Sequence, residues 1–189
     1  MSIEILELPE VRERLLRYSV EVYEQMPERD AQGRRTELIR GIIIQKMPKS
    51  PLHASISKRL YDRVLALTPE GFTVRADQPL RLIDSMPEPD VTVARGKDSE
   101  FWEQHPRTAE LAIEVAVSTL SLDRANAALY AENGVREYWI VIPRQRCVEV
   151  YRDPHNGEYR EKHIFSDEQT LACEGIPAIA LNVADIFTP

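Results

Sequence analysis

The chain has 189 residues, of which 43% are hydrophobic and 29% charged, and its net charge is −7. This composition is typical of a soluble globular protein, and the length predicts a single domain over residues 1–189. No apolar run reaches the roughly 18 residues that a membrane span requires, and the N-terminus lacks a signal-peptide layout. Cys147 and Cys173 lie too far apart in sequence to suggest a zinc site or a disulfide framework. We therefore expect a cytoplasmic protein that does not bind a membrane.

The charges are distributed unevenly along the sequence. Between Arg34 and Arg63 there are eight basic residues and two acidic ones, a local balance of +6 that leaves −13 for the remainder. The negative total argues against nucleic acid, because phosphate contacts require Lys and Arg. The basic stretch nevertheless suggests one side of the molecule that faces a polyanion. Charges scattered along a helix also serve simply to solvate it, so both interpretations stay open.

The first half of the chain alternates helical and extended patterns. Residues 9–26 are predicted as an N-terminal helix, because a proline starts them and apolar residues recur three or four positions apart. Residues 36–44 are predicted as a strand, with Gly41 marking a turn or bulge. Residues 52–67 carry an apolar side chain at every fourth position from Leu52 to Val64, which predicts an amphipathic helix. Short strands are expected over 72–75 and 79–82.

The second half of the chain is richer in strands. An alanine-rich helix is predicted over 124–133, with Asp123 as its N-cap and Gly134 as its C-cap. A single helical turn is expected over 182–187. Strands that flank helices in this order predict an α/β fold with a mixed central β-sheet. Apolar runs place these later strands over 91–94, 111–117, 137–142, 147–151 and 159–165.

Glu114 stands out because it lies in the middle of an apolar strand pattern. An ionised carboxylate in a buried strand is costly unless a cation or hydrogen bonds compensate it. In a strand of period two, Leu111, Ile113 and Val115 share one face, and Glu114 points to the other between two alanines. Small neighbours leave room around Glu114 for a metal ion or a substrate. An ion pair with Arg or Lys is the alternative explanation.

Two further carboxylates lie at the ends of predicted strands. Asp90 follows Pro87-Glu88-Pro89 at the start of one strand, and Glu37 lies at the edge of another. Three oxygen ligands without clustered Cys or His select Mg²⁺ or Mn²⁺ over zinc. Each carboxylate alone is equally consistent with a turn cap or a solvated edge residue. Together they predict a site for a hard divalent cation.

Several motifs in the same order resemble the Uma-two (Uma2) family of restriction endonucleases. The resemblance runs from about Glu37 to Tyr151, and the combination of motifs is more specific than any one of them. The motifs are Glu37-Leu38-Ile39-x-Gly41, Lys46 to His53, Pro87-Glu88-Pro89-Asp90, Ile113 to Ser118, Asp123-Arg124, and Tyr130-Ala131-Glu132-x-Gly134-Val135-x-Glu137 followed by Tyr138 to Val141.

The resemblance implies membership of the PD-(D/E)XK nuclease superfamily. It implies a restriction-endonuclease-like core over about 37–151, followed by C-terminal strands over 159–189, with the active site at one edge of the sheet. Asp90 then matches the metal-binding aspartate, Glu114 its acidic partner, and Glu37 the acidic residue that precedes them. The implied reaction is phosphodiester hydrolysis by a metal-activated water.

One position departs from the family pattern. The motif requires a lysine two residues after the glutamate, where this chain has Ala116, and the family places a lysine on the following helix, where this chain has Asn126. An amide can hydrogen-bond a water or a phosphate but carries no charge for the developing anion. We expect Asn126 to act there with partial compensation by Lys46 or Lys49.

The sequence therefore favours a Mg²⁺-dependent DNA endonuclease that needs no organic cofactor. A homodimer is one oligomeric state that this prediction allows. Its predicted catalytic residues are Asp90, Glu114, Glu37, Asn126 and Lys46. Its predicted nucleic-acid contacts are Arg40, Lys46, Lys49 and His53. The alternative is a degenerate nuclease fold that binds nucleic acid or a protein partner. A small-molecule-binding α/β domain is a third possibility, supported only by the composition.

Overall fold

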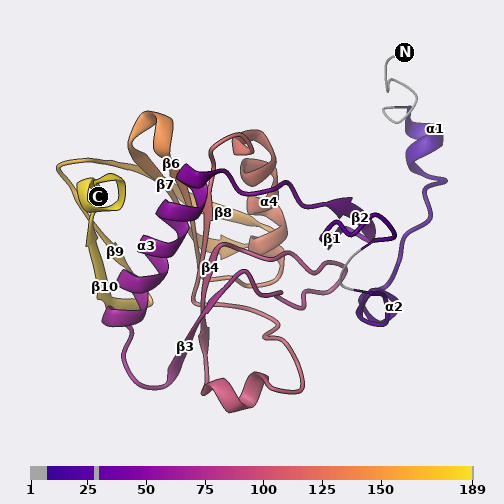
Figure 1. Cartoon of the computed structure of the whole chain (residues 1–189), viewed down its shortest axis with the longest axis horizontal. Coiled ribbons are helices and arrows are strands. Elements are labelled where there is room, and N and C mark those ends of the chain that lie inside the picture. Colours follow the sequence, from indigo (N-terminus) through magenta and orange to yellow (C-terminus); the bar gives the residue numbers. More distant parts are fainter. Residues whose placement is uncertain (1–7, 28–29, 189) are drawn as a thin grey trace.

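The computed structural model describes residues 8–27 and 30–188. Residues 1–7, 28–29 and 189 of the expected domain lie outside the described residues. The predicted mixed α/β fold is confirmed: a six-stranded sheet is flanked by helices (Figure 1). Within the described residues, no helix is both long enough and apolar enough to cross a membrane.

The central sheet has the strand order β3-β4-β5-β6-β7-β8. Only β5 and β6 run parallel, because α4 (Leu120–Glu132) connects them as a crossover helix. The other neighbours pair antiparallel. The strands are β3 (Phe72–Ala76), β4 (Val91–Arg95), β5 (Leu111–Val115), β6 (Glu137–Ile142), β7 (Cys147–His155) and β8 (Glu158–Ser166).

The two faces of this sheet carry separate hydrophobic cores. Leu111, Ile113 and Val115 pack with α3 (Pro51–Leu67), with the hairpin of β9 (Thr170–Cys173) and β10 (Ile176–Asn182), and with α5 (Val183–Phe187). Ala112 and Ala116 pack with α4 on the opposite face. The alternation predicted around Glu114 is therefore confirmed, and Glu114 itself lies on the α4 face.

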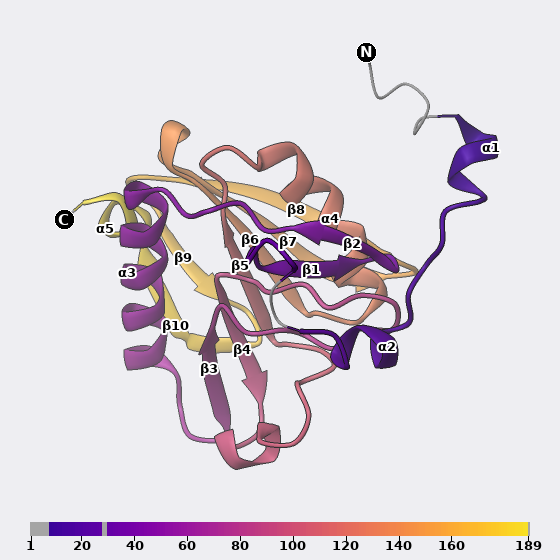
Figure 2. The same cartoon turned by 45° about the vertical axis from the view of Figure 1, so that its right-hand side comes forward.

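The N-terminal segment does not form the single helix predicted over 9–26. It contains two short helices, α1 (Pro9–Arg12) and α2 (Val20–Glu24). Ser19 caps α2 by accepting a hydrogen bond from the N–H of Val22 at 3.3 Å. The backbone between the helices pairs with the hairpin instead, since the Tyr18 N–H donates to the Gly41 carbonyl at 2.8 Å. This tertiary contact competes with the local helical pattern, and α1 projects away from the sheet (Figures 1 and 2).

The strand predicted over 36–44 is a hairpin of β1 (Thr36–Ile39) and β2 (Ile42–Gln45). Its turn is formed by Arg40 and Gly41, both with positive φ (53° and 75°), as a type I′ turn requires. A Cβ at Gly41 would lie 2.8 Å from the Cβ of Arg17, so glycine also permits the close approach of the N-terminal segment.

Further local predictions differ from the structure. Residues 79–82 form no strand: Leu80 and Leu82 are buried, but their N–H groups bond within a turn and to Pro87. The connection between β4 and β5 contains a 3₁₀ helix, η2 (Asp98–Phe101), and a second one, η3 (Pro143–Gln145), links β6 and β7. Strands β9 and β10 were not predicted individually. Helix α4 begins earlier than predicted, with consequences for the site.

Candidate active site

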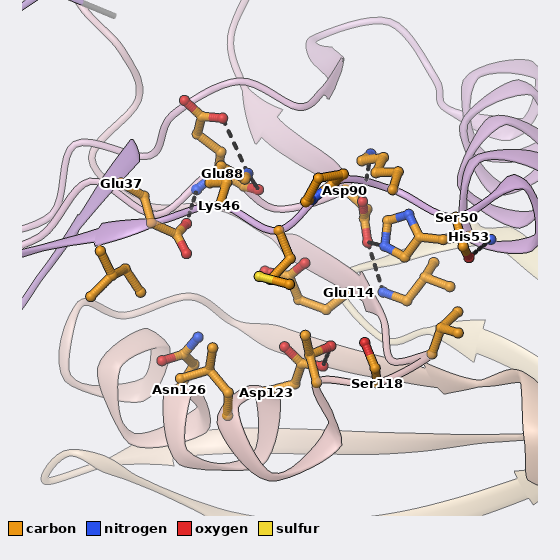
Figure 3. A pocket seen from close by; sticks show the side chains of 18 of the residues that line it. Glu37, Lys46, Ser50, His53, Glu88, Asp90, Glu114, Ser118, Asp123 and Asn126 are labelled. Carbon is orange, nitrogen blue, oxygen red and sulfur yellow. Dashed lines mark hydrogen bonds and ion pairs between the residues drawn. The ribbon is translucent and has the colours of Figure 1, made fainter. Parts of the chain in front are cut away.

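A cavity of about 170 Å³ opens beside the end of β5. Its walls come from the β1–β2 hairpin and the loop after it, the N-terminus of α3, and the first turns of α4 (Figure 3). Of the eight site residues predicted from the sequence, the structure brings seven to this cavity and leaves Arg40 outside it. The seven are Glu37, Lys46, Lys49, His53, Asp90, Glu114 and Asn126.

Asp90 is fixed at the start of β4 by contacts from three directions. Its Oδ2 accepts a hydrogen bond from the N–H of Val115 at 2.8 Å, which ties it to the strand of Glu114. The ammonium of Lys49 lies 2.7 Å from Oδ1, and the Nε2 of His53 lies 3.1 Å from Oδ2. Burial raises the pKa of Asp90, but the His53 hydrogen bond and the Lys49 charge outweigh it, so the pKa lies below its usual value. Asp90 is thus an ionised carboxylate with its charge already compensated.

Glu114 has the opposite electrostatic environment. Its Oε1 accepts a hydrogen bond from the hydroxyl of Tyr130 at 3.1 Å. Burial raises the pKa of Glu114 well above its ordinary value, and the negative charges of Asp90 and Asp123 raise it further. Figure 3 shows Glu114 between Asp90 on one side and Asp123 on the other. Ionising Glu114 therefore costs free energy unless a cation enters the cavity.

Asp123 does not cap α4 as predicted. Thr119 occupies the N-cap position, and the N–H of Asp123 already bonds to the Thr119 carbonyl at 3.0 Å, so Asp123 lies inside the helix. Its carboxylate points into the cavity and accepts a hydrogen bond from the Thr119 hydroxyl at 2.6 Å. Burial raises its pKa to about 6, with a further contribution from Asp90. Asn126 consequently lies in the second turn of α4 and lines the cavity one turn after Asp123.

Glu37 and Lys46 form the hairpin side of the cavity together with Glu88. The ammonium of Lys46 donates to the Glu88 carbonyl at 2.9 Å and lies 3.1 Å from its carboxylate. Glu37 accepts a long hydrogen bond of 3.4 Å from the N–H of Glu88. Burial raises the pKa of Glu37, partly offset by the positive charge of Lys46. Glu88 is thus an unpredicted residue that holds Lys46 in place.

The basic stretch from Arg34 to Arg63 does not form one continuous positive surface. Lys46 and Lys49 reach the cavity, and Arg35 pairs with Glu88 at its hairpin side, whereas the other five basic side chains bond away from it. Arg40 at the hairpin turn pairs with Glu132 and, at 3.7 Å, with Asp84. The remaining partners are Asp30 for Arg34, Glu88 for Arg35, Asp62 for Lys58, the Ile186 carbonyl for Arg59, and Asp185 for Arg63.

The carboxylate oxygens at the cavity are the ligand type that a hard divalent cation prefers, but the side chains are not already arranged around a metal position. Among residues 8–27 and 30–188, no group of three His, Cys, Asp or Glu side chains is arranged as a ready-made metal site. Mg²⁺ binds through one or two carboxylates, waters and substrate phosphate, so a closed protein cage is not required. The donor set is the sign of a fit, since Glu37, Asp90, Glu114 and Asp123 bring carboxylate oxygens to one cavity, and a cation there would lower the raised pKa values of Glu114 and Asp123.

Comparison with known proteins decides the family of this chain. The sequence model of the Uma2 family, described as "Putative restriction endonuclease", matches residues 20–184. The chain belongs to the Uma2 family. One matching solved structure is that of "a putative nuclease belonging to DUF820" from Anabaena variabilis ATCC 29413. Its TM-score is 0.76 at 18% identity, covering 89% of this chain and 97% of that chain, so it supports the shared fold. No curated protein matches the sequence.

Asp123 lines the cavity of this Uma2 protein, and the prediction that it caps α4 is wrong. That prediction depends only on its place before an alanine-rich segment. One signal was nevertheless present: Asp123, Asn126 and Tyr130 recur three and four positions apart, on the helix face that also carries the buried Ala127. Polar side chains on the buried face of a helix predict a polar site beneath it.

Proposed function

We propose that this Uma2 protein is a metal-dependent endonuclease that hydrolyses phosphodiester bonds in DNA. The observation that carries the proposal is the meeting of Asp90 and Glu114 at one cavity, from antiparallel neighbouring strands. The hydrogen bond from the Val115 N–H to Asp90 fixes their relative position. Family membership supports a nuclease fold, and the acidic cavity beside two lysines supports this chemistry.

Asp90, Glu114 and Glu37 are the residues that would hold Mg²⁺ or Mn²⁺. When bound, such an ion lowers the pKa of a water and neutralises phosphate charge. Lys46 and Lys49 line the cavity with partly exposed side chains, which suits them to contact a phosphate. His53 keeps Asp90 ionised and oriented. Asn126 can donate a hydrogen bond to a water or phosphate but cannot supply the positive charge of a lysine.

We accordingly propose slow cleavage, with Lys46 supplying part of the missing charge. Losing one well-placed electrostatic contact costs on the order of 3 kcal/mol, or about a hundredfold in rate. We also propose that the protein acts as a homodimer in the cytoplasm and needs no organic cofactor. DNA is the proposed partner, bound over the cavity mouth by Lys46 and Lys49, with Arg40 outside this contact.

The test is single-turnover cleavage of supercoiled plasmid DNA with Mg²⁺ or Mn²⁺. Asp90→Asn should reduce the rate at least about a hundredfold, because it removes a charged ligand. Lys46→Ala should reduce it about tenfold. Asp62→Asn, an exposed acid paired with Lys58 on α3, is the matched control and should cleave like the wild type. Cleavage that survives Asp90→Asn unchanged contradicts the proposed active site.

A second candidate function is nucleic-acid binding without cleavage. It is favoured by Asn126, which replaces the lysine that the family pattern places on this helix. Under this alternative, the wild type binds DNA with an affinity that falls steeply with salt, because phosphate contacts release counterions. Absence of cleavage in a protein that demonstrably binds Mn²⁺ and DNA would decide in its favour.

A further inference from the structure

A second cavity, of about 860 Å³, adjoins the proposed active site. Its walls come from α2, the start of β1 and the connections that follow β3 and β4. Glu88 lines both cavities: its carboxylate lies 3.1 Å from the ammonium of Lys46 on one side and pairs with Arg35 on the other. Asp77 of the second cavity likewise pairs with Lys49 of the first. The two cavities thus share a wall of ion pairs, and the second has the volume of a site for a small organic ligand.

Most charged side chains of the second cavity already have partners. Arg81, for example, pairs with Glu24 at 2.9 Å. Among residues 8–27 and 30–188, Arg107 and Glu103 are the lining residues that carry a charge and form no ion pair. Both are exposed. An arginine without an acidic partner is suited to contact a phosphate, because its planar donor groups match the phosphate oxygens.

His105 presents a hydrogen-bond donor to this cavity, and a buried arginine fixes its tautomer. The Nη2 of Arg75 on β3 donates to the Nδ1 of His105 at 2.8 Å. Because a guanidinium has no acceptor, Nδ1 must accept, and the proton of a neutral ring is carried by Nε2. Burial lowers the pKa of His105, and the charge of Arg75 lowers it further, so the ring is neutral at pH 7. The Nε2–H group has no hydrogen-bond partner among the described residues.

Arg75 itself is a buried cation without an anionic partner. It is only 5% exposed, and no carboxylate that the structure describes forms an ion pair with it. Its Nε is buried without a hydrogen bond, as is the Oγ1 of Thr92, its partner in register on β4. Arg75 contacts two residues that line the second cavity, His105 and Phe101, whose ring centroid lies 5.5 Å from the guanidinium carbon. Its uncompensated positive charge therefore favours a ligand that carries a negative charge.

Trp102 adds an exposed aromatic surface to the same cavity. Its side chain is 77% exposed, and its Nε1 donates to Asp98 at 2.9 Å, which orients the indole. The other tryptophan of the chain, Trp139, is fully buried in the central sheet. An exposed indole beside hydrogen-bond donors and an unpaired arginine is suited to stack on a nucleobase.

We infer that the second cavity binds one unpaired nucleotide of the DNA strand that enters the proposed active site. The base stacks on Trp102 and accepts a hydrogen bond from the Nε2–H of His105, and the phosphate pairs with Arg107. The shared wall at Glu88 places this nucleotide next to the phosphodiester in the active site. Only an unpaired nucleotide fits this role, because neighbouring base pairs cover the base faces in a duplex. The inference deepens the proposed function and rests on it for the identity of the polymer.

Binding of a fluorescein-labelled single-stranded oligodeoxynucleotide to the full chain in EDTA tests this site without cleavage. Binding should shield Trp102 of the wild type from quenching by acrylamide, a signal to which the buried Trp139 does not contribute. Trp102→Ala should weaken the binding about tenfold, because stacking of one base is lost. Ile164→Ala, which truncates an exposed apolar side chain on β8 that lines neither cavity, is the control and should bind like the wild type.

The phosphate contact has its own signature in the salt dependence. Arg107→Ala should reduce the slope of log affinity against log salt concentration by about 0.7, because one phosphate contact of a single strand is lost. Arg160→Ala removes the same charge from an arginine that pairs with Asp153 at 3.5 Å, and should leave the slope unchanged. His105→Phe should weaken binding but keep the shielding of Trp102. If His105→Phe fails to fold, the Trp102 and Arg107 variants decide, since both side chains are exposed.

Four outcomes overturn the inference in distinguishable ways. Wild-type affinity in both Trp102→Ala and Arg107→Ala places the strand elsewhere, while cleavage that depends on Asp90 keeps the proposed function. Shielding of Trp102 by deoxyadenosine monophosphate as strong as that by the oligonucleotide indicates a site for free nucleotides. Equal shielding by duplex DNA removes the requirement for an unpaired nucleotide. No binding of any DNA by the wild type, with or without Mg²⁺, removes this site and the proposed function together.

Discussion

Glu114 and Glu149 lie in one row of the central sheet but have opposite surroundings. Glu114 on β5 pairs in register with Ile140 on β6, and Ile140 pairs with Glu149 on β7. Helix α4 reaches the surroundings of both glutamates through two consecutive residues, Asp123 and Arg124. Arg124 forms an ion pair with Glu149, whereas Asp123 lies at the cavity of Glu114.

The difference between the two glutamates separates a structural carboxylate from a candidate functional one. Glu149 also accepts from Tyr151 at 2.8 Å and lies 3.0 Å from the ammonium of Lys162. Burial opposes its ionisation, but the hydrogen bonds from Arg124, Lys162 and Tyr151 lower its pKa to about 2. The pKa of Glu114 is raised well above normal, first by burial and then by Asp90. Burial raises the pKa of both residues, so the presence or absence of ion-paired cations is the property that distinguishes them.

Removing the charge of Glu149 should give the largest change in stability. Glu149→Gln is expected to lower the free energy of unfolding at pH 7 by about 3 kcal/mol. It removes the charge of a buried carboxylate that forms ion pairs with two cations and accepts a hydrogen bond from a tyrosine. The lowered pKa means that this stabilisation is fully present above about pH 4.5 and is lost as the pH falls toward 2. Urea unfolding at pH 7 and between pH 5 and 2 measures both effects. A variant as stable as the wild type at pH 7 would refute the structural role.

Asp123 should show the opposite pH dependence in metal-free buffer. Its folded pKa is raised to about 6 from 3.8, so the folded state binds the proton more tightly than the unfolded state does. Stability contributed by this group is present below about pH 4 and is lost as the pH rises through 6. We expect Asp123→Asn to be more stable than the wild type at pH 7 by about 2 kcal/mol, since it carries no charge. The check is urea unfolding in EDTA from pH 4 to 8; parallel pH profiles for both proteins would contradict it.

Removing either of two tyrosine hydroxyls should give the smallest changes in stability, and the two substitutions are closely matched. Tyr130→Phe removes the one hydrogen bond that Glu114 receives from a side chain in the described residues, at an expected cost of about 1 kcal/mol. Tyr151→Phe removes the hydrogen bond that Tyr151 donates to Glu149. Glu149 keeps its ion pairs with Arg124 and Lys162, so this substitution should cost under about 0.5 kcal/mol. Urea unfolding at pH 7 compares the two variants. Equal losses would mean that the paired cations do not distinguish the two glutamates.

The sequence by itself determined the arrangement around Glu114. Alternation of apolar residues with Ala112, Glu114 and Ala116 is a local pattern of period two, and the structure confirms both faces. Period-four apolar residues likewise predicted α3 nearly to its ends. These features depend on neighbours in the chain, which a sequence shows directly. The motifs of the Uma2 family added the fold, which the family match and the similar structure support.

Only the tertiary structure decided which polar residues meet. The position of Asp123 depends on where α4 begins, and Thr119 sets that start four residues before the predicted cap. Arg40 was grouped with Lys46 by sequence proximity, but the hairpin turn directs it to Glu132. The helix predicted over 9–26 is broken where the N–H of Tyr18 donates to the carbonyl of Gly41, 23 positions later in the sequence. In each case a contact between distant segments outweighs a local preference worth only tenths of a kcal/mol per residue.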